Sequence, residues 1–255
     1  VYDIHTQKIK ESEFSFSTFD FSKADVHAIT KDKAGNLWLG INGKGVILLP
    51  ATTNQFKYMG YKSATTNKIG SNCIKAICKD NEGTLWLGTA NDGIYGIKGK
   101  NKPSQHFEHK ETSNSVPSTI NHIHQTADGR LWLASPLEGL AEMDPKTGLC
   151  RYYKFQDHHQ NEVKNISYLT SDKNGEQLWV ASLGGGLFYI DLKTGKVNRC
   201  DTFESGKEYQ ENYNALPNRW IASLLYTRNN KLYIGTYDGL GCLDAVSYTH
   251  LTLPT

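Results

Sequence analysis

The stretch Ala76–Gly93, AICKDNEGTLWLGTANDG, contains every feature that recurs along this chain of 255 residues. An apolar run ends at Asp80, a tight turn follows at Asn81–Gly83, a second apolar run surrounds Trp86, and a polar loop closes the unit. Four further copies share this arrangement and begin at Ala28, His122, Tyr168 and Ser223.

One aromatic residue lies at the centre of each copy and defines the period of the repeat. These residues are Trp38, Trp86, Trp132, Trp179 and Tyr233. They follow one another at separations of 48, 46, 47 and 54 residues. A nearly constant period in this range is typical of propellers, solenoids and repeat arrays.

Each full repeat predicts four short strands, as the second copy illustrates. Its strands are expected near Ile74–Lys79, Thr84–Thr89, Ile94–Lys98 and Gln105–His109. The turn between the first two strands reads Asp-x-x-Gly, in which Asp bonds to nearby backbone and Gly supplies the positive φ that closes a hairpin. The run Leu85–Leu87 is apolar on both faces, which predicts a sheet that is covered on both sides. Four-stranded sheets stacked face to face are the blades of a β-propeller.

We therefore predict an all-β fold, a β-propeller of about five four-stranded blades that is a fragment of a larger propeller. A closed five-bladed ring is the alternative. The propeller is expected over residues 1–244: a partial blade at 1–21, then units near 24–62, 74–110, 120–156, 166–204 and 221–244, the last with three strands. Residues 245–255 lack the Thr-Gly turn of the earlier units and resemble foreign read-through, so the prediction leaves this tail outside the fold. The five repeat aromatics are predicted to form the core between blades, because so large a side chain in mid-strand dominates packing.

Composition narrows the classes of function. Lys and Arg total 28 against 26 Asp and Glu, so the chain lacks the strong basic excess of a nucleic-acid binder. No apolar run approaches the roughly 20 residues that cross a bilayer, and the chain does not open with a signal-peptide pattern. The five Cys form no CxxC pair and are interpreted as small buried hydrophobes, with metal or redox chemistry as the alternative.

Two sets of polar segments are expected to meet on one face of the propeller. Short loops join the second and third strands of each blade. Longer linkers join one blade to the next, at Tyr58–Cys73, His109–Thr119, Phe155–Asn165 and Phe203–Trp220. Linkers beyond about 12 residues are usually functional or disordered, so their convergence predicts a binding surface. The predicted ligand contacts are Asn42, Lys44, Asn91, Asp92, Glu138, Arg219, Trp220, Tyr237 and Asp238.

Arg219 and Trp220 are the most suggestive pair. They end a linker that also contains Tyr209, Tyr213 and Asn218. Such a set suits a sugar, because an aromatic ring stacks on the pyranose face and forked donors bind hydroxyls or acidic groups. The alternatives are a linker that packs on the propeller rim and a surface for another protein.

Catalytic and metal chemistry finds little support in the sequence. His122 and His124 share one face of a strand and could bind a metal, but no carboxylate or third His at matching positions joins them, so they are interpreted as polar lining of the channel. His158 and His159 are interpreted as solvated loop residues. The Gly cluster Ser182–Gly186 is followed by no helix, which argues against a phosphate site. We predict no catalytic residue, no metal and no cofactor; a propeller enzyme such as a lyase is the alternative.

The string Asp-x-x-Gly-x-Leu-Trp followed by a Gly-rich loop resembles the two-component regulator propeller repeat. The matching pieces are Asp32–Gly40, Asp80–Thr89, Ala127–Ser135, Asp172–Ser182 and Arg228–Thr236, and the leaders Ser71–Ile74 and Leu216–Ile221 also fit. The resemblance covers residues 1–244. It implies a periplasmic or extracellular sensor propeller of a hybrid two-component system of Bacteroidetes, often responding to glycan fragments.

The resemblance also implies partners. They are an oligosaccharide or other small ligand, further blades, a β-sandwich module, a membrane helix and a histidine kinase, with any kinase activity outside this chain. A homodimer is a further expectation. We expect neither a nucleic-acid partner nor a membrane segment in this chain. A protein–protein interaction platform is the remaining alternative function.

Overall fold

The computed structural model describes residues 2–3, 8–9, 25–43, 45–51, 69–70, 73–99, 104–157, 159–200, 216–245 and 251–252. The chain divides into two units, Val1–Lys57 and Tyr58–Thr255, and each is described by itself. Every regular element among the described residues is a strand, which confirms the all-β prediction. In this part of the chain no helix is long and apolar enough to span a membrane.

The first unit holds one small antiparallel sheet of three strands, the first blade. The strands are β3 (Val26–Lys31), β4 (Leu37–Ile41) and β5 (Gly45–Leu49). A separate two-stranded pair joins β1 (Tyr2–Asp3) to β2 (Lys8–Ile9). The fourth strand expected for the unit near 24–62 falls outside the described residues.

The second unit consists of four antiparallel sheets, each of four strands paired in chain order. The second blade contains β6 (Ile74–Lys79), β7 (Leu85–Thr89), β8 (Ile94–Ile97) and β9 (Gln105–Phe107). The third contains β10 (His122–Gln125), β11 (Leu131–Ala134), β12 (Leu140–Met143) and β13 (Cys150–Tyr153). The fourth contains β14 (Ile166–Ser171), β15 (Gln177–Ser182), β16 (Gly186–Asp191) and β17 (Val197–Arg199). The fifth contains β18 (Ile221–Tyr226), β19 (Lys231–Thr236), β20 (Gly239–Asp244) and β21 (Leu251–Thr252).

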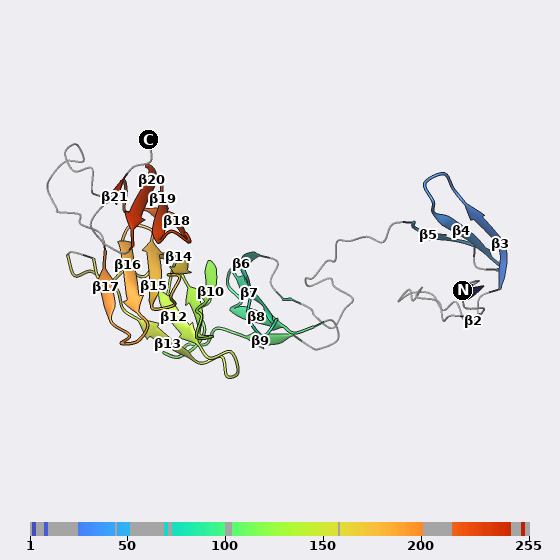
Figure 1. Ribbon diagram of the computed structural model, residues 1–255. Helices are drawn as coiled ribbons and strands as arrows, with labels where there is room; N and C mark the ends of the chain where they lie inside the picture. The colour runs from blue at the N-terminus through green and yellow to red at the C-terminus, as the bar shows by residue number, and fades with distance from the viewer. Residues whose placement is uncertain are drawn as a thin grey trace. The chain divides into compact units, whose positions relative to one another are not determined.

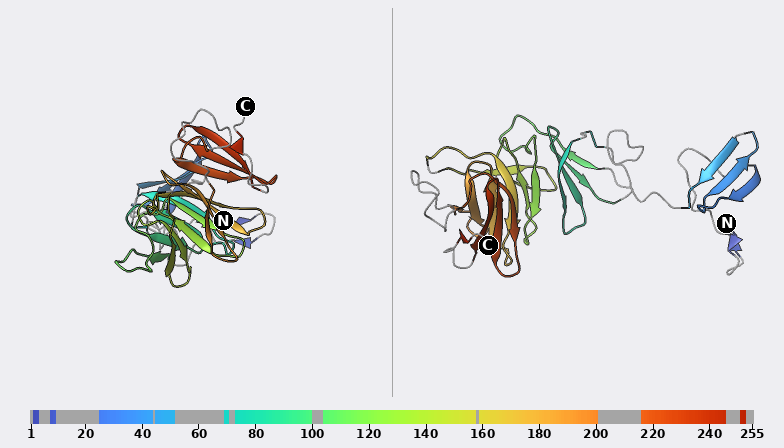
Figure 2. Two further views of the ribbon diagram at one scale, coloured as in Figure 1. Left: turned by 90° about the vertical axis from the view of Figure 1, so that its left-hand side faces the viewer. Right: turned by 90° about the horizontal axis from the view of Figure 1, so that it is seen from above.

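These four sheets stand side by side in chain order, as Figures 1 and 2 show. Their first strands are neighbours: β6 lies beside β10, β10 beside β14, and β14 beside β18. The predicted four-stranded blades are therefore confirmed, and no sheet among the described residues closes on itself.

The repeat aromatics connect one blade to the next. Trp86 is 2% exposed and packs in one core cluster with Leu131 and Leu133 of the third blade. Trp132 and Trp179 are fully buried in the same way. Trp132 lies with Leu178 and Val180, and Trp179 with Leu232 and Ile234. The Leu-Trp-Leu pattern thus sends the two aliphatic side chains toward the preceding blade and the Trp toward the following one.

Two of the five predicted core aromatics are not buried. Tyr233 is only partly buried, although its neighbours Leu232 and Ile234 are fully buried against the fourth blade. Tyr233 points to the other face of β19, on which no further sheet of the described residues packs. Trp38 is 39% exposed, in a unit whose other described sheet is the two-stranded β1–β2 pair. The predicted core role of these two residues is therefore not seen among the described residues, because burial of a blade face requires a neighbouring sheet.

The Asp of the turn has a second role that the sequence analysis missed. Asp80 accepts a hydrogen bond from the Thr84 backbone N–H at 2.7 Å and another from the Trp86 indole Nε1–H at 2.8 Å. Asp32 bonds Trp38 in the same way, at 2.9 Å. The turn therefore fixes the orientation of the Trp in the next strand.

The third and fourth blades modify this bond in a way that follows from their sequences. In the third blade Thr126 replaces Asp, and its hydroxyl accepts from Trp132 Nε1 at 3.3 Å. In the fourth blade one residue is inserted, and Asp172 accepts instead from the backbone N–H groups of Glu176 and Gln177, at 2.8 and 2.9 Å.

The tail departs from the sequence prediction at two residues. Leu251 pairs with Leu243, and Thr252 with Cys242, so β21 completes the fifth sheet as a short fourth strand. The prediction left residues 245–255 outside the fold, whereas the open edge of β20 offers backbone groups with which Leu251 and Thr252 pair.

Candidate ligand-binding site

The short loops and the leaders, the segments just before the first strands, meet at one end of each blade. The second loop residue donates its backbone N–H to the carbonyl oxygen of the residue that precedes the first strand. These bonds join Asn42 to Asp25 (2.9 Å), Ala90 to Cys73 (3.0 Å), Leu183 to Asn165 (2.9 Å) and Tyr237 to Trp220 (3.1 Å). In the third blade this loop position is Pro136, which has no N–H. We call this end of each blade the loop face.

In the second to fifth blades the first residue of the loop is a Ser or Thr whose hydroxyl shapes the turn. Thr89 donates to the Gly93 carbonyl at 2.9 Å and accepts from the Asp92 N–H at 3.0 Å. Ser182 accepts from the Gly185 N–H at 2.9 Å. Such hydroxyls replace backbone partners in tight turns, which explains their place in the repeat.

Glu138 has a structural role in the third blade. It accepts hydrogen bonds from the Ser118 N–H at 3.2 Å and the Ser118 hydroxyl at 2.6 Å, and another from Ser135. Burial acts to raise the pKa of this carboxyl, but the hydrogen bonds from Ser118 and Ser135 outweigh it and hold the pKa below its ordinary value. Glu138 therefore ties the leader of the third blade to its loop.

Asp92 has a comparable structural role in the second blade. Its carboxylate accepts from the Tyr95 hydroxyl at 2.6 Å, and the same hydroxyl accepts from the Gly70 N–H in the leader at 2.9 Å. His106 stacks on Tyr95 with ring centroids 3.9 Å apart. Burial and the bond to Asp92 raise the pKa of Tyr95 to about 12, so this hydroxyl stays protonated.

The fifth blade uses its acidic residue to place an aromatic one. Asp238 accepts a hydrogen bond from the Asn218 side-chain amide, and Asn218 Oδ1 accepts from the Trp220 backbone N–H at 2.8 Å. Trp220 stacks against Tyr237, with ring centroids 5.9 Å apart and an angle of 29° between the planes. Trp220 is 48% exposed and Tyr237 is 65% exposed. We call these two residues the aromatic platform.

The Gly-rich loop of the fourth blade borders the aromatic platform. Leu183 forms a β-bridge with Trp220, and the Gly184 N–H donates to the Arg219 carbonyl at 3.1 Å. A Cβ on Gly184 would lie 3.9 Å from the indole ring. A Cβ on Gly185 would collide with Val163 and the Ser182 hydroxyl, so this glycine serves close packing.

The remaining predicted contacts are dispersed. Asn91 has a φ of 78° and accepts from the Thr119 hydroxyl at 3.4 Å in the second blade. Asn42 bonds Asp25 at 3.2 Å in the first unit. The structure brings Arg219, Trp220, Tyr237 and Asp238 together on one blade. Lys44, Tyr209, Tyr213 and His158 lie outside the described residues.

One long linker follows a different course from the predicted one. The linker His109–Thr119 runs along the outer strand of the third blade, where Asn114 accepts from the Cys150 N–H at 2.8 Å and Ser115 accepts from the Tyr152 hydroxyl at 2.9 Å. It protects a sheet edge, and only its end at Ser118 returns to the loop face. The prediction of a binding role for this linker is therefore weakened.

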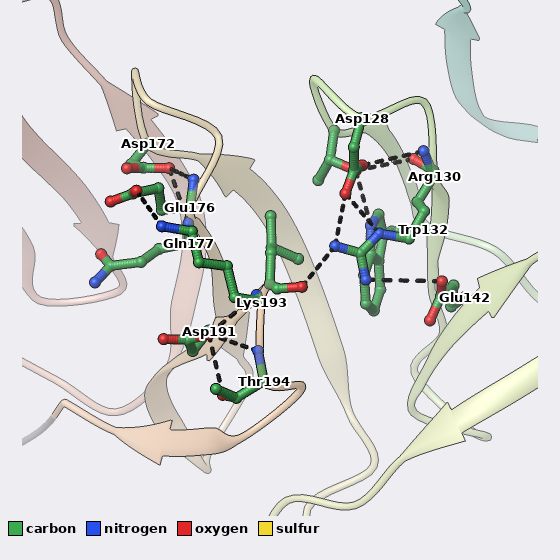
Figure 3. Close-up of polar contacts among 12 residues, drawn as sticks. Asp128, Arg130, Trp132, Glu142, Asp172, Glu176, Gln177, Asp191, Lys193 and Thr194 are labelled. Atoms are coloured by element: carbon green, nitrogen blue, oxygen red, sulfur yellow. Dashed lines mark hydrogen bonds and ion pairs between the residues drawn. The ribbon is translucent and has the colours of Figure 1, made fainter.

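The opposite end of the third and fourth blades carries a charged network that is structural (Figure 3). Arg130 bonds Asp128 through Nε at 2.8 Å, donates to the Leu192 carbonyl of the fourth blade at 3.0 Å, and lies 5.5 Å from the centroid of the Trp132 ring. Lys193 bonds Glu176 at 2.7 Å. A shallow cavity of about 570 Å³ is lined by Asp128 and Arg130 together with Glu142, Asp144 and Arg151.

His122 and His124 lie at the boundary between the third and fourth blades. His122 stacks on Tyr168 with ring centroids 3.9 Å apart, and His124 Nε2 lies 2.8 Å from the Ser171 hydroxyl. Burial, and secondarily His124, lower the pKa of His122 to about 4, so the ring is neutral near pH 7. The described residues include no group of three His, Cys, Asp or Glu side chains that could hold a metal.

Comparison with known proteins agrees with the repeat. Residues 68–91 match the family model described as two component regulator propeller. At these residues the chain is similar to one two component regulator propeller repeat. No curated protein matches the chain.

Several solved structures share the propeller fold. The extracellular domain of BT4673 from B. thetaiotaomicron, described as a hybrid two component system, has a TM-score of 0.62 and 18% identity over 89% of this chain and 30% of its own. The extracellular domain of BT3049 from the same organism has a TM-score of 0.57 and 21% identity, over 73% of this chain and 25% of its own. PorZ, a surface component of the type-IX secretion system of Porphyromonas gingivalis, has a TM-score of 0.58 and 18% identity, over 91% of this chain and 34% of its own. The chain thus spans about a third of their length or less, and the likeness concerns the fold.

Proposed function

We propose that this propeller repeat chain is a non-catalytic, ligand-sensing part of a two-component signalling protein outside the cytoplasm, and that its ligand is a glycan fragment. The observation that carries the proposal is the aromatic platform, Trp220 with Tyr237, exposed on the loop face of the fifth blade. The extracellular location of the B. thetaiotaomicron structures supports the compartment. Further blades and the signalling domains would lie elsewhere in the same protein.

The aromatic platform stands out when equivalent positions are compared. The residue before the first strand and the second loop residue form a pair in every blade. The pairs are Asp25 and Asn42, Cys73 and Ala90, Asn121 and Pro136, Asn165 and Leu183, and Trp220 and Tyr237. Among these described pairs, the fifth is the one with two aromatic rings. The scaffold does not require aromatics here, and their exposure leaves apolar surface in water without a gain in folding.

The chemistry of the aromatic platform suits a sugar. A pyranose ring has an apolar face that stacks on an aromatic ring, and its hydroxyls need several hydrogen bonds of about 0.5–1.5 kcal/mol each. Asn218 and Asp238 lie beside the rings and contribute side-chain polar groups. The bordering residue Gly184 is exposed and has no side chain, so a ligand can approach the backbone closely there.

The test is calorimetric titration of a glycan panel against the full sensor domain and two variants, Trp220→Ala and Tyr237→Ala. We expect each variant to weaken binding by about tenfold, while the melting temperature changes little because both side chains are exposed. Trp132→Ala serves as the matched control, since it removes a buried ring from the scaffold and is expected to lower the melting temperature.

Two results would change the proposal. Unchanged affinity in both platform variants would remove the aromatic platform from the site. Absence of binding by the parent to every glycan would favour a surface for another protein, because exposed aromatic residues are also enriched at interaction sites. A lyase would be indicated by cleavage of a glycan in the same titrations.

A further inference from the structure

We infer that the glycan held by the aromatic platform carries no acidic group. The inference rests on the proposed function and concerns the charge beside the platform. Asp238 follows Tyr237 directly and is connected to the Trp220 backbone through Asn218. Its carboxylate therefore lies next to both rings on which a sugar would stack.

The Asp238 carboxylate has a neutral partner. It accepts a hydrogen bond from the Asn218 amide. Among the residues that the structure describes, none forms an ion pair with this carboxylate. Asp238 is exposed. It differs in this from Glu138, which is partly buried and accepts from Ser118 of the leader with one oxygen and from Ser135 of the loop with the other. A ligand on the platform thus meets a negative charge that no described cation neutralises by direct contact.

The nearby cations are engaged elsewhere. The Nε atom of Arg219 is buried, so the base of its guanidinium faces the fold. Arg199 lies over the Phe188 ring, 5.7 Å from the ring centroid, with one nitrogen 3.5 Å from the Gly185 carbonyl. Lys164 pairs with Glu162 at 3.3 Å. The sequence suggested that Arg219 could bind acidic groups, and the geometry favours rejection of such groups instead.

The size of the effect follows from Coulomb's law. Two unit charges about 6 Å apart repel strongly enough in bulk water to change a binding constant about threefold, and the lower dielectric constant beside a protein raises the effect to about tenfold or more. Salt screens this repulsion within a Debye length of about 10 Å. A repulsive group of this kind discriminates between ligands that otherwise make the same contacts. Neutral glycans keep the stacking and hydrogen bonds, whereas uronates lose affinity.

The experiment compares each glycan that binds with the same glycan after oxidation of its C6 hydroxymethyl groups to carboxylates. In the full sensor domain at low salt, we expect the oxidised form to bind about three- to tenfold more weakly. Asp238→Asn should restore its affinity and leave the neutral glycan unchanged, because an amide oxygen still accepts from Asn218. Added salt should narrow the difference in the parent and have little effect in the variant.

Glu111→Gln is the matched control, since it removes one exposed carboxylate from the linker between the second and third blades. It should leave the ratio of the two affinities unchanged. The inference is overturned if the parent binds the oxidised glycan as tightly as the neutral one, or if Asp238→Asn changes both affinities by the same factor. If no glycan of the panel binds, the proposed function itself fails and the inference falls with it.

Discussion

Removal of the Trp86 side chain tests the central packing element of the repeat. Trp86 is 2% exposed, donates its indole N–H to Asp80 at 2.8 Å, and contacts the core of the third blade. Emptying a large aromatic core site costs about 3–5 kcal/mol. We expect Trp86→Ala to lower the free energy of unfolding by this amount, measured by urea denaturation followed by far-UV circular dichroism.

Gly96 gives this prediction a second, sharper test. Gly96 lies directly across from Trp86 in the β7–β8 pairing, and a Cβ added there would lie 2.8 Å from the Trp86 ring. Gly96→Ala should therefore cost about 1–3 kcal/mol by overpacking. In the Trp86→Ala background the ring is absent, and Ala is favoured over Gly in a strand by about 0.5–1 kcal/mol.

The double-mutant cycle should thus give a coupling of about 2 kcal/mol or more, with Gly96→Ala changing from harmful to neutral or stabilising. Equal cost of Gly96→Ala in both backgrounds would refute the packing of the indole over this glycine. A Trp86→Ala variant as stable as its parent would refute the whole assignment of Trp86 to the core between blades.

Three further predictions concern the blade boundaries. The lowered pKa values of His122 and His124 mean that the unfolded chain binds protons more readily, so stability should be complete above about pH 6.5 and fall as the pH drops toward 4. His122→Phe keeps the stacking on Tyr168 and should flatten this part of the urea-midpoint profile; an identical profile would exclude His122 as the cause. Arg130→Lys should cost about 1–2 kcal/mol in urea unfolding, because Lys cannot reproduce the forked contacts to Asp128 and Leu192, and an unchanged midpoint would contradict this. Gly185→Ala should lower the unfolding free energy by about 1–3 kcal/mol through its collision with Val163, whereas a neutral result would show that the loop can relax.

Most of the fold could be predicted from local sequence. In the second blade every predicted strand overlaps the observed one, because the Asp-x-x-Gly turn and the apolar runs act over a few residues. Trp38 and Tyr233 could not be predicted in this way. Their burial depends on a neighbouring sheet, and the same local pattern occurs whether or not that sheet is in contact.

The structural contacts of the acidic loop residues could not be predicted for a related reason. Glu138 and Asp238 each accept a hydrogen bond from a leader residue, Ser118 and Asn218, that lies 20 residues earlier. The equal spacing in two blades is a signal that could have revealed them. Each of these hydrogen bonds connects a leader to a loop, and the two segments come together only once the whole blade has formed.

The repeat itself indicates where function is to be sought. Features that four of the five blades share, such as the Ser or Thr at the start of the loop or the bond between loop and leader, are explained by folding of the blade. A binding site must then arise where one blade differs from the others without a structural reason. Trp220 and Tyr237 meet this condition, since the equivalent pairs in the other blades are polar, small or aliphatic and support the same backbone bond wherever an N–H is present. The scaffold tolerates these rings but does not need them, and this is why their removal should affect binding far more than stability.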